Sequence, residues 1–302
     1  MAFTIGSDWV EATRTNLQGS FADQRVALGA PYVAGSGTLT FASTNPAIAV
    51  GAILSIGLNI FYVTGAITAS LTATVIGGQN GSTDVSAASA SIVRINPQFT
   101  DWDIWTALGA DLADLSSPLN GLYSMQYTDF NYQSNIVQYD LGAAAANQLI
   151  EIYQLRHLTP GSFKDFNAIS KEAWELILNA YTGDIPNGIG VYINNPSGLY
   201  PSYKVRAYWL SKFVMPTDPT QVLSTSLLAS TNYDLPPLGA AIQIMAGREV
   251  MRNAPTQQDF RRATEVPAGA VGASANGLKS LRQMRIDAEA ARLAKMYPYY
   301  KD

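Results

Sequence analysis

The sequence contains no cysteine among its 302 residues and only one histidine, His157. The missing thiols exclude a disulfide framework, a cysteine nucleophile and cysteine-ligated zinc or iron–sulfur sites. A base at His157 would need a nucleophile and an orienting partner, and no local motif supplies them. We therefore expect His157 to be a structural residue on a strand edge, and we predict no catalytic residue, no metal ligand and no cofactor.

Recognisable motifs of catalysis and phosphate binding are also missing. The segment "GGQNG" (77–81) lacks the Gly-Lys-Ser/Thr ending of a phosphate loop and predicts a hairpin turn instead. The carboxylate pairs Asp101/Asp103 and Asp111/Asp114 fit helix N-terminal charge and a solvated helix face better than they fit metal ligation. These absences argue against an enzyme.

Charge is scarce. Asp, Glu, Lys and Arg make up 14% of the chain, against about a quarter in typical soluble domains. From Val26 to Val93 the only charged side chain is Asp84. Because so little charge is present to resist association, we expect partners to cover part of this surface.

The charge that is present is unevenly distributed. Residues 1–240 carry 9 Lys and Arg against 17 Asp and Glu, a net charge of −8, whereas residues 241–302 carry 10 against 6, a net charge of +4. An acidic body with a basic tail fits self-assembly or docking onto an acidic surface. An ordinary helical end with solvated basic faces explains the tail equally well.

A long uncharged run spans residues 46–71, "PAIAVGAILSIGLNIFYVTGAITASL". It is long enough to cross a bilayer, but Leu54, Ile56 and Ile60 alternate with small or polar residues at a period of two, and no Lys/Arg cluster flanks the run. The pattern predicts a pair of strands and no membrane association. The first residues lack a basic segment followed by an apolar core, so we expect no secretory signal.

Helical and strand patterns alternate in blocks along the chain. Short strands with tight turns between residues 35 and 97 predict a small antiparallel barrel or sandwich. Four further strands are expected in a second block at 120–215, at residues 147–158, 173–181, 188–196 and 203–215. Thr100 and Asp103 form a helix-capping signal. The predicted class is α+β: a small β barrel or sandwich module and a second β sandwich, attached to a helical core with a C-terminal helical tail. The predicted boundaries are 1–30 (N-terminal helix and lead-in), 31–97 (small β module), 98–118 (helix), 119–232 (β sandwich) and 233–302 (C-terminal helices, which form the helical core with 1–30 and 98–118).

The last predicted helix covers residues 278–297 and follows a flexible connector at 256–277. Its apolar side is predicted to hold Leu278, Leu281, Met284, Ala288 and Ala291. A second side carries the basic residues Arg282, Arg285, Arg292 and Lys295. We expect this helix to dock onto a partner; the alternative is that it packs on the body's own helices.

The order of these parts resembles the head-to-tail connector (adaptor) proteins of long-tailed bacteriophages. The similarity covers roughly half of the chain, and includes "LGAAIQIMAGREVMR" (238–252) and "RLAKMYP" (292–298) near the C-terminal end. The chain departs from the family pattern at Gly77, where an Arg is expected, and within "VSAASAS" (85–91), where a His is expected. The residues that carry the resemblance in the β module and the helix after it are Gly51, Leu54, Ile56, Tyr62, Val63, Gly78, Gly81, Ser82, Val93, Arg94, Ile95, Asn96, Pro97, Phe99 and Ile104.

The resemblance implies a structural virion protein. It implies a homo-oligomeric ring, a dodecamer, that joins the portal protein to downstream neck or tail proteins and leaves a channel for the genome, with nonspecific contact to passing DNA. The ring would lie in the virion neck after assembly in the host cytoplasm. The candidate portal- or channel-facing residues are Arg282, Arg285, Arg292 and Lys295, and the candidate subunit interface is Thr72, Thr74, Gly78, Gly81 and Ser82.

Two alternatives remain open at this point. One is another phage tail component, such as a tail-completion or baseplate protein. The other is a carbohydrate- or surface-binding β protein, because Tyr and Trp are frequent between residues 120 and 215. The adaptor hypothesis predicts a ring of many copies, whereas the carbohydrate hypothesis predicts a monomer with an exposed aromatic face.

Overall fold

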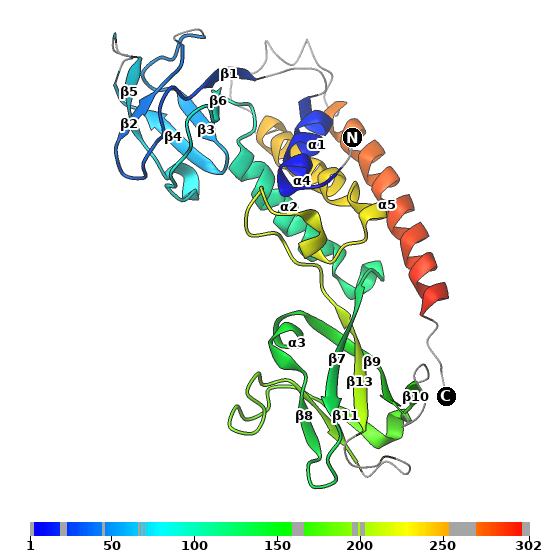
Figure 1. The fold of residues 1–302 in the computed structure, drawn as a ribbon. Coiled ribbons are helices and arrows are strands. Elements are labelled where there is room, and N and C mark those ends of the chain that lie inside the picture. Colours follow the sequence, from blue (N-terminus) through cyan, green and yellow to red (C-terminus); the bar gives the residue numbers. More distant parts are fainter. Residues whose placement is uncertain are drawn as a thin grey trace. The chain divides into compact units, whose positions relative to one another are not determined.

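Figure 1 shows the chain in a computed structural model, which describes residues 3–18, 23–43, 46–65, 67, 69, 71–158, 166–194, 199, 203–253 and 270–297. The chain divides into two compact units. The first unit is Met1–Asp114, Met215–Ser224 and Ser230–Asp302, and the second unit is Leu115–Val214 and Thr225–Ala229. Helices occur together with antiparallel sheets, so the predicted α+β class is confirmed.

The described residues of the first unit include a six-stranded antiparallel sheet with the order β1-β6-β3-β4-β5-β2. The edge strands β1 and β2 are linked through their ends by a bridge between Leu28 and Phe41 and by hydrogen bonds from Gly29 N to Thr40 O and from Ala42 N to Ala27 O. The strands are β1 (Gln24–Ala27), β2 (Thr38–Thr40), β3 (Ile53–Ile56), β4 (Asn59–Val63), β5 (Thr72–Ile76) and β6 (Ile92–Ile95).

The interior of this β module is filled by alternating apolar side chains. In β5, Ala73 and Val75 are buried while Thr72, Thr74 and Ile76 point outward, as the period of two predicts. β3 and β4 form a hairpin, which confirms that the uncharged run at 46–71 contains a pair of strands. Within the described ranges, no helix combines the length and the hydropathy needed to cross a membrane.

Strand β1 was not predicted. Residues 1–30 were expected to form the N-terminal helix and its lead-in, but Gln24–Ala27 pair along their whole length with β6. The β module therefore begins before residue 31. A four-residue strand whose partner lies almost 70 residues away leaves little local signal, because its pairing depends on the long-range contact.

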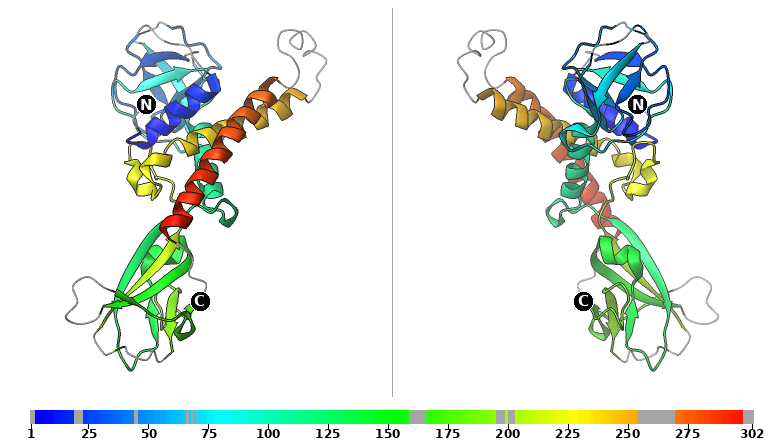
Figure 2. Two further views of the ribbon diagram at one scale, coloured as in Figure 1. Left: turned by 90° about the vertical axis from the view of Figure 1, so that its right-hand side faces the viewer. Right: turned by 90° about the vertical axis from the view of Figure 1, so that its left-hand side faces the viewer.

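Among the described residues of the first unit, four α-helices accompany the β module: α1 (Gly6–Gln18), α2 (Asp101–Leu115), α4 (Leu235–Asn253) and α5 (Ala270–Met296). α1 contacts α4, and α4 and α5 run side by side in both views of Figure 2. The predicted cap of α2 is confirmed, since Thr100 Oγ1 accepts a hydrogen bond from Asp103 N at 3.1 Å. α5 begins at Ala270, so residues 270–277 of the expected connector are helical, and its residues 256–269 lie outside the described residues.

The buried side of α5 differs from the predicted apolar stripe. Leu281 and Met284 are exposed, whereas Ile286, Glu289 and Leu293 are buried. The helix packs on α4, so the structure shows the intramolecular packing that the sequence analysis gave as its alternative, through different residues. A second apolar stripe, which includes Leu281 and Met284, remains on the exposed side.

The second unit contains two antiparallel sheets, ordered β10-β9-β13-β7 and β11-β12-β8. Residues of both sheets, including Trp174 and Trp209, belong to one hydrophobic cluster. The elements are β7 (Ser124–Asn131), β8 (Gln138–Asp140), α3 (Gly142–Gln148), β9 (Leu149–Leu158), β10 (Phe166–Ala168), β11 (Trp174–Ile177), β12 (Gly190–Ile193) and β13 (Lys204–Ser211). Short 3-10 helices are η1 (Gln79–Gly81), η2 (Pro118–Asn120), η3 (Lys171–Ala173), η4 (Leu223–Ser226) and η5 (Ser230–Asn232).

The second unit corrects two further expectations. Its boundaries are narrower than 119–232 at the C-terminal end, because Met215–Ser224 and Ser230 onward belong to the first unit. His157 lies on β9, which is flanked by β10 and β13, so it is inside the sheet and not on an edge. Burial lowers the pKa of His157 and favours its neutral form.

Candidate functional site

Asp84 is the only charged residue between Val26 and Val93, and its hydrogen bonds connect separate segments of the β module. Its carboxylate accepts hydrogen bonds from Tyr32 Oη at 3.0 Å, from Asn59 Nδ2 at 2.9 Å and from Gly35 N at 2.9 Å. Burial by itself would raise the pKa of Asp84, but these hydrogen bonds together outweigh it and hold the pKa below its ordinary value. The half-buried carboxylate is therefore hydrogen-bonded within the module.

The same carboxylate explains the glycine at position 77. A Cβ placed on Gly77 would lie 2.4 Å from Asp84 Oδ1, so a side chain there would have to displace this carboxylate from its hydrogen bonds. The neighbouring Gly78 has φ +69°, a left-handed conformation that glycine adopts at little cost. Glycine at position 77 therefore leaves the Asp84 carboxylate in place.

The outward face of the β module carries apolar side chains at adjacent positions. Ile53 pairs with Tyr62 and Tyr62 pairs with Ile76, so the three residues lie next to one another on β3, β4 and β5. They are 38%, 43% and 52% exposed, respectively. We call this set the apolar row. The apolar row was not predicted. The signal for it in the sequence was the large apolar residues at strand positions that alternate with the core positions.

The residues proposed as a subunit interface fall in different places. Thr74 is exposed and Thr72 is half-buried on the outward side of β5, and Gly81 is exposed at the tip of the turn, with Gly78 half-buried beside it. The structure corrects the predicted place of Ser82 in the subunit interface. It is buried, and its hydroxyl accepts a hydrogen bond from Ile60 N and donates one to Gln79 O, so it stabilises the turn and cannot contact another subunit.

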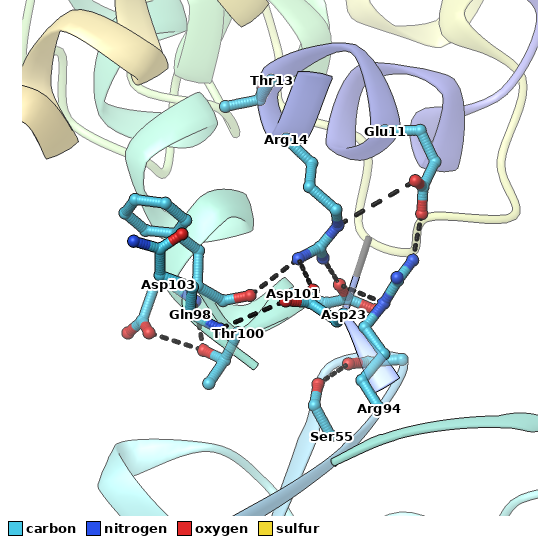
Figure 3. Close-up of polar contacts among 12 residues, drawn as sticks. Glu11, Thr13, Arg14, Asp23, Ser55, Arg94, Gln98, Thr100, Asp101 and Asp103 are labelled. Atoms are coloured by element: carbon cyan, nitrogen blue, oxygen red, sulfur yellow. Dashed lines mark hydrogen bonds and ion pairs between the residues drawn. The ribbon is translucent and has the colours of Figure 1, made fainter. Parts of the chain in front are cut away.

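A cluster of buried charges joins the β module to the helices of the first unit. Figure 3 shows Arg14 of α1 and Arg94 of β6 facing the carboxylates of Glu11, Asp23 and Asp101. Arg14 pairs with Asp101 and, at 3.1 Å, with Asp23, and it donates to Phe99 O at 2.8 Å. Arg94 pairs with Glu11 and, at 3.4 Å, with Asp101.

Both arginine side chains in this cluster are about 95% buried. Burial raises the pKa of Asp101 and lowers the pKa of Arg14, because each charged form loses hydration, while the attraction between them opposes both shifts. Removing one partner of such a buried pair typically costs about 3–5 kcal/mol, because the remaining charge stays buried. The cluster thus fixes the end of the β module relative to α1 and α2.

A cleft of about 700 Å³ opens beside this cluster. It is bordered by the β3–β4 turn, the loop at 83–88, Trp102 and residues 217–220. Its charged residues are already paired within the chain: Arg94 and Asp101 belong to the cluster, and Asp218 accepts hydrogen bonds from Thr220 N and Oγ1 at 2.6 and 2.7 Å. Each charged residue of the cleft thus has a partner within the chain, although Arg94 Nη1 is buried without a hydrogen-bond partner among the described residues.

The first of the proposed channel-facing residues, Arg282, faces the interior of its own unit, which corrects that assignment. Its Nη2 lies 2.7 Å from Asp111 Oδ1 and 3.0 Å from Asp114 Oδ2, both on α2. Asp111 is only 1% exposed, so it is not on a solvated helix face as predicted. Burial raises the pKa of Asp111 to about 7, against the opposing effect of Arg282.

The other three candidate basic residues of α5 differ in whether they pair with a carboxylate. Arg285 Nη2 lies 2.9 Å from Asp234 Oδ1, and Arg292 pairs with Glu289 of the same helix at 2.6 Å. Lys295 is exposed, and no carboxylate within the described ranges lies at ion-pair distance from it. Intramolecular pairing thus reduces the positive charge that α5 can offer to a partner.

No group of three or more His, Asp or Glu residues capable of holding a metal ion occurs in the part of the chain that the structure describes. Two exposed surfaces of the first unit are candidate sites: the uncharged outward face of β3, β4 and β5, and the exposed side of α5. Comparison of the chain with protein-family models, with curated proteins and with solved structures finds no match.

Proposed function

We propose that the chain is a non-enzymatic structural protein of a virion. Copies of it assemble into a closed ring that joins the portal to the tail of a long-tailed bacteriophage, with a central channel for the genome. The ring lies in the neck, at the junction of head and tail, after assembly in the host cytoplasm. Its partners are other copies of the chain, the portal protein and downstream neck or tail proteins.

The observation that carries this proposal is the uncharged outward face of β3, β4 and β5. Asp84, the only charge in that stretch of 68 residues, is bound by three donors of the module itself. The apolar row Ile53–Tyr62–Ile76 and the hydroxyl of Thr74 remain on the surface. A contact between such faces desolvates few charges, which favours permanent association.

A closed ring suits this face because each copy buries one patch against a different patch of its neighbour. The family resemblance supports a dodecamer. It also supports the finer architecture that we propose for the chain: the six-stranded sheet closes into a barrel, the two sheets of the second unit form a sandwich, and α5 is a helical tail attached to a helical core.

The exposed side of α5 is the surface that we propose for the portal. It carries Leu281, Met284 and Lys295, whereas the opposite side is buried on α4 and α2. Of the four candidate basic residues, Lys295 contributes most to transient contact with DNA phosphates, because the other three pair with carboxylates.

The ring proposal is tested by placing a charge in the apolar row. Tyr62→Lys should abolish the ring, because every interface would then bury an ammonium group. Tyr181→Lys is the matched control, since Tyr181 is 77% exposed in a loop of the second unit. Electron microscopy and sedimentation of the purified proteins, alone and with the portal protein, measure the outcome. Rings of Tyr62→Lys like those of the wild type, or a wild type that never forms rings, would contradict the proposal; the latter would favour another tail component.

The portal-docking proposal needs a variant that leaves the fold intact. Truncation of α5 is unsuitable for this test, because it would expose the surface that Ile286 and Leu293 cover and so disturb the fold. The double variant Leu281→Glu and Met284→Glu changes exposed positions only, and Gln283→Glu adds a charge to a different side of the same helix as a control. We expect the double variant to form rings but to lose binding to the portal. Unchanged binding would show that this side of α5 does not dock.

A further inference from the structure

The second unit carries an outward sheet face that the ring proposal does not use. It is built by β7, β13 and β9, whose inner face packs into the core through Val205 and Ala207 among others. Because strand side chains alternate, Arg206 and Tyr208 point away from that core.

Two rows of residues cross the three strands on this outward face. In each row, residues on neighbouring strands stand directly opposite one another, so their side chains are adjacent. The first row is Asp129, Arg206 and Arg156, and the second row is Tyr127, Tyr208 and Gln154.

The first row carries more positive than negative charge. Arg206 binds Asp129 through two hydrogen bonds, of 2.7 and 2.9 Å, and Lys204 Nζ lies 3.3 Å from the same carboxylate. Hydrogen bonding from Arg206 is the largest effect that lowers the pKa of Asp129, so the carboxylate stays ionised. Asp129 therefore pairs with two cations of this patch, Arg206 and Lys204, and Arg156 adds a third positive charge.

The position of Arg156 is unfavourable for the stability of the sheet. It stands directly opposite Arg206, and like charges at opposite positions destabilise a sheet. Arg156 Nε donates to Gln154 Oε1 at 2.7 Å, and within the described residues no carboxylate lies at ion-pair distance from its guanidinium. Two like charges at opposite positions break a local rule of sheet stability, which is typical of a functional position.

Aromatic rings lie beside these guanidinium groups. Tyr127 is 58% exposed, and its ring centroid is 6.3 Å from that of Tyr208. The Cζ of Arg206 lies 4.1 Å from the centre of the Tyr127 ring, and the Cζ of Arg156 lies 5.6 Å from that of Tyr208. These contacts hold the guanidinium groups in defined positions, which pre-organises the patch.

We propose that this face binds an acidic carbohydrate, a sugar ring that carries a carboxylate. The guanidinium of Arg156 provides parallel N–H donors for the carboxylate. The tyrosine rings provide flat apolar surface for the sugar ring, while Gln154 and Asp129 provide an amide and an acceptor for sugar hydroxyls. This site is independent of the ring and goes beyond the proposed connector function.

Nucleic acid fits the same face less well. A phosphate backbone is bound by a stripe of cations, whereas here Asp129 stands among the cations and repels phosphates. Asp129 is instead suited to accept hydrogen bonds from sugar hydroxyls. The observations therefore favour an acidic sugar, and nucleic-acid binding becomes an outcome of the test.

The test measures binding of the full-length protein to polygalacturonate, a carboxylated polysaccharide, by isothermal titration calorimetry. Methyl-esterified polygalacturonate has the same sugar rings without the charge, and single-stranded DNA provides a phosphate backbone. We expect binding to polygalacturonate that weakens as salt rises, at least tenfold weaker binding to the methyl ester, and weaker binding to DNA.

Two variants locate the site. Arg156→Gln should weaken polygalacturonate binding at least tenfold and leave the thermal midpoint unchanged or raised, because the charge opposing Arg206 is removed. Tyr127→Ala, at an exposed position, should weaken binding several-fold. Arg25→Gln makes the same substitution at an exposed strand position in the first unit and should bind like the wild type.

Three results would overturn the proposal. The first is a wild-type protein that does not bind polygalacturonate. The second is equal binding by the wild type and both site variants, which would place binding elsewhere. The third is DNA that binds more tightly than polygalacturonate and competes with it, which would assign the face to nucleic acid.

Discussion

At the scale of single residues, the surroundings of two carboxylates shift their pKa values in opposite directions. Asp84 is surrounded by hydrogen-bond donors that stabilise its charge, whereas Asp111 is buried beside one guanidinium and loses more by dehydration than it gains. The pKa of Asp84 is therefore lowered and that of Asp111 is raised. The two residues should contribute to stability over different ranges of pH.

The substitution Asp84→Asn should destabilise the β module by about 2 kcal/mol, since hydrogen bonds to a charged group are stronger than neutral ones. The folded pKa of Asp84 is below its ordinary value, so this stabilisation is present above about pH 4 and is lost as the pH falls through the folded pKa. Urea unfolding at pH 7 and at pH 3 measures both effects. Glu175→Gln, at an exposed strand position, is the control and should change stability by less than about 0.5 kcal/mol. Equal effects of the two variants would contradict the role of Asp84.

The pH dependence of Asp111 has the opposite sign. Its folded pKa, about 7, lies above its ordinary value of 3.8, so the folded protein binds the proton more tightly than the unfolded chain does. Its favourable contribution is full below about pH 4 and is lost as the pH rises through 7. Relative to Asp111→Asn, which cannot titrate, the wild type should lose up to about 4 kcal/mol of unfolding free energy between pH 4 and pH 8. Parallel stability profiles of the two proteins would show that Asp111 is not buried as described.

At the scale of elements, the contact between α2 and α4 depends on a helix position without a side chain. A Cβ on Gly239 of α4 would lie 1.6 Å from Asp111 Oδ1 of α2, and this carboxylate is held in place by Arg282 of α5. Three helices therefore meet around one carboxylate. The close approach needs glycine although glycine weakens a helix interior.

Gly239→Ala should consequently destabilise the first unit by about 3 kcal/mol, because overpacking forces α2 and α4 apart. Gly247→Ala, in the same helix, is the matched control: nothing lies within 4 Å of a Cβ at that position. The control should be neutral or stabilise the protein by up to about 1 kcal/mol through helix propensity. Thermal unfolding followed by circular dichroism compares them, and a neutral Gly239→Ala would contradict the close contact.

At the scale of the whole molecule, the chain has separate hydrophobic clusters in its two units. One fills the β module of the first unit and contains Leu54, and the other joins the two sheets of the second unit and contains Ile152. Each unit thus contains a buried hydrophobic core of its own. We therefore expect the units to unfold in separate steps.

Calorimetry of two core variants tests this expectation. Leu54→Ala and Ile152→Ala each remove a side chain that is at most 1% exposed, and each should cost about 3 kcal/mol. Leu54→Ala should lower the midpoint of one transition and Ile152→Ala that of the other. A single transition that both variants shift equally would show that the two units unfold as one.

Local patterns were sufficient for elements whose signals lie within a few residues. The alternation in β5, the hairpin of β3 and β4, and the Thr100 cap of α2 all depend on neighbours in sequence, and the structure confirms them. β7 was missed for the opposite reason. Its inward residues Gln126 and Thr128 are polar. Thr128 Oγ1 donates a hydrogen bond to Leu141 O and accepts one from Trp209 Nε1, partners that lie 13 and 81 residues away in the chain.

The composition of the β module, with one charge in 68 residues, is a property of the sequence alone, and it is enough to predict a surface that a partner covers. Which side of α5 is buried was decided by tertiary structure. The apolar stripe with Leu281 and Met284 is the better hydrophobic face by sequence, yet the buried stripe includes Arg282 and Glu289. Charged side chains can be buried there because Asp111 stands opposite Arg282 and Asn232 hydrogen-bonds Glu289, so their lost hydration is replaced by partners from other helices.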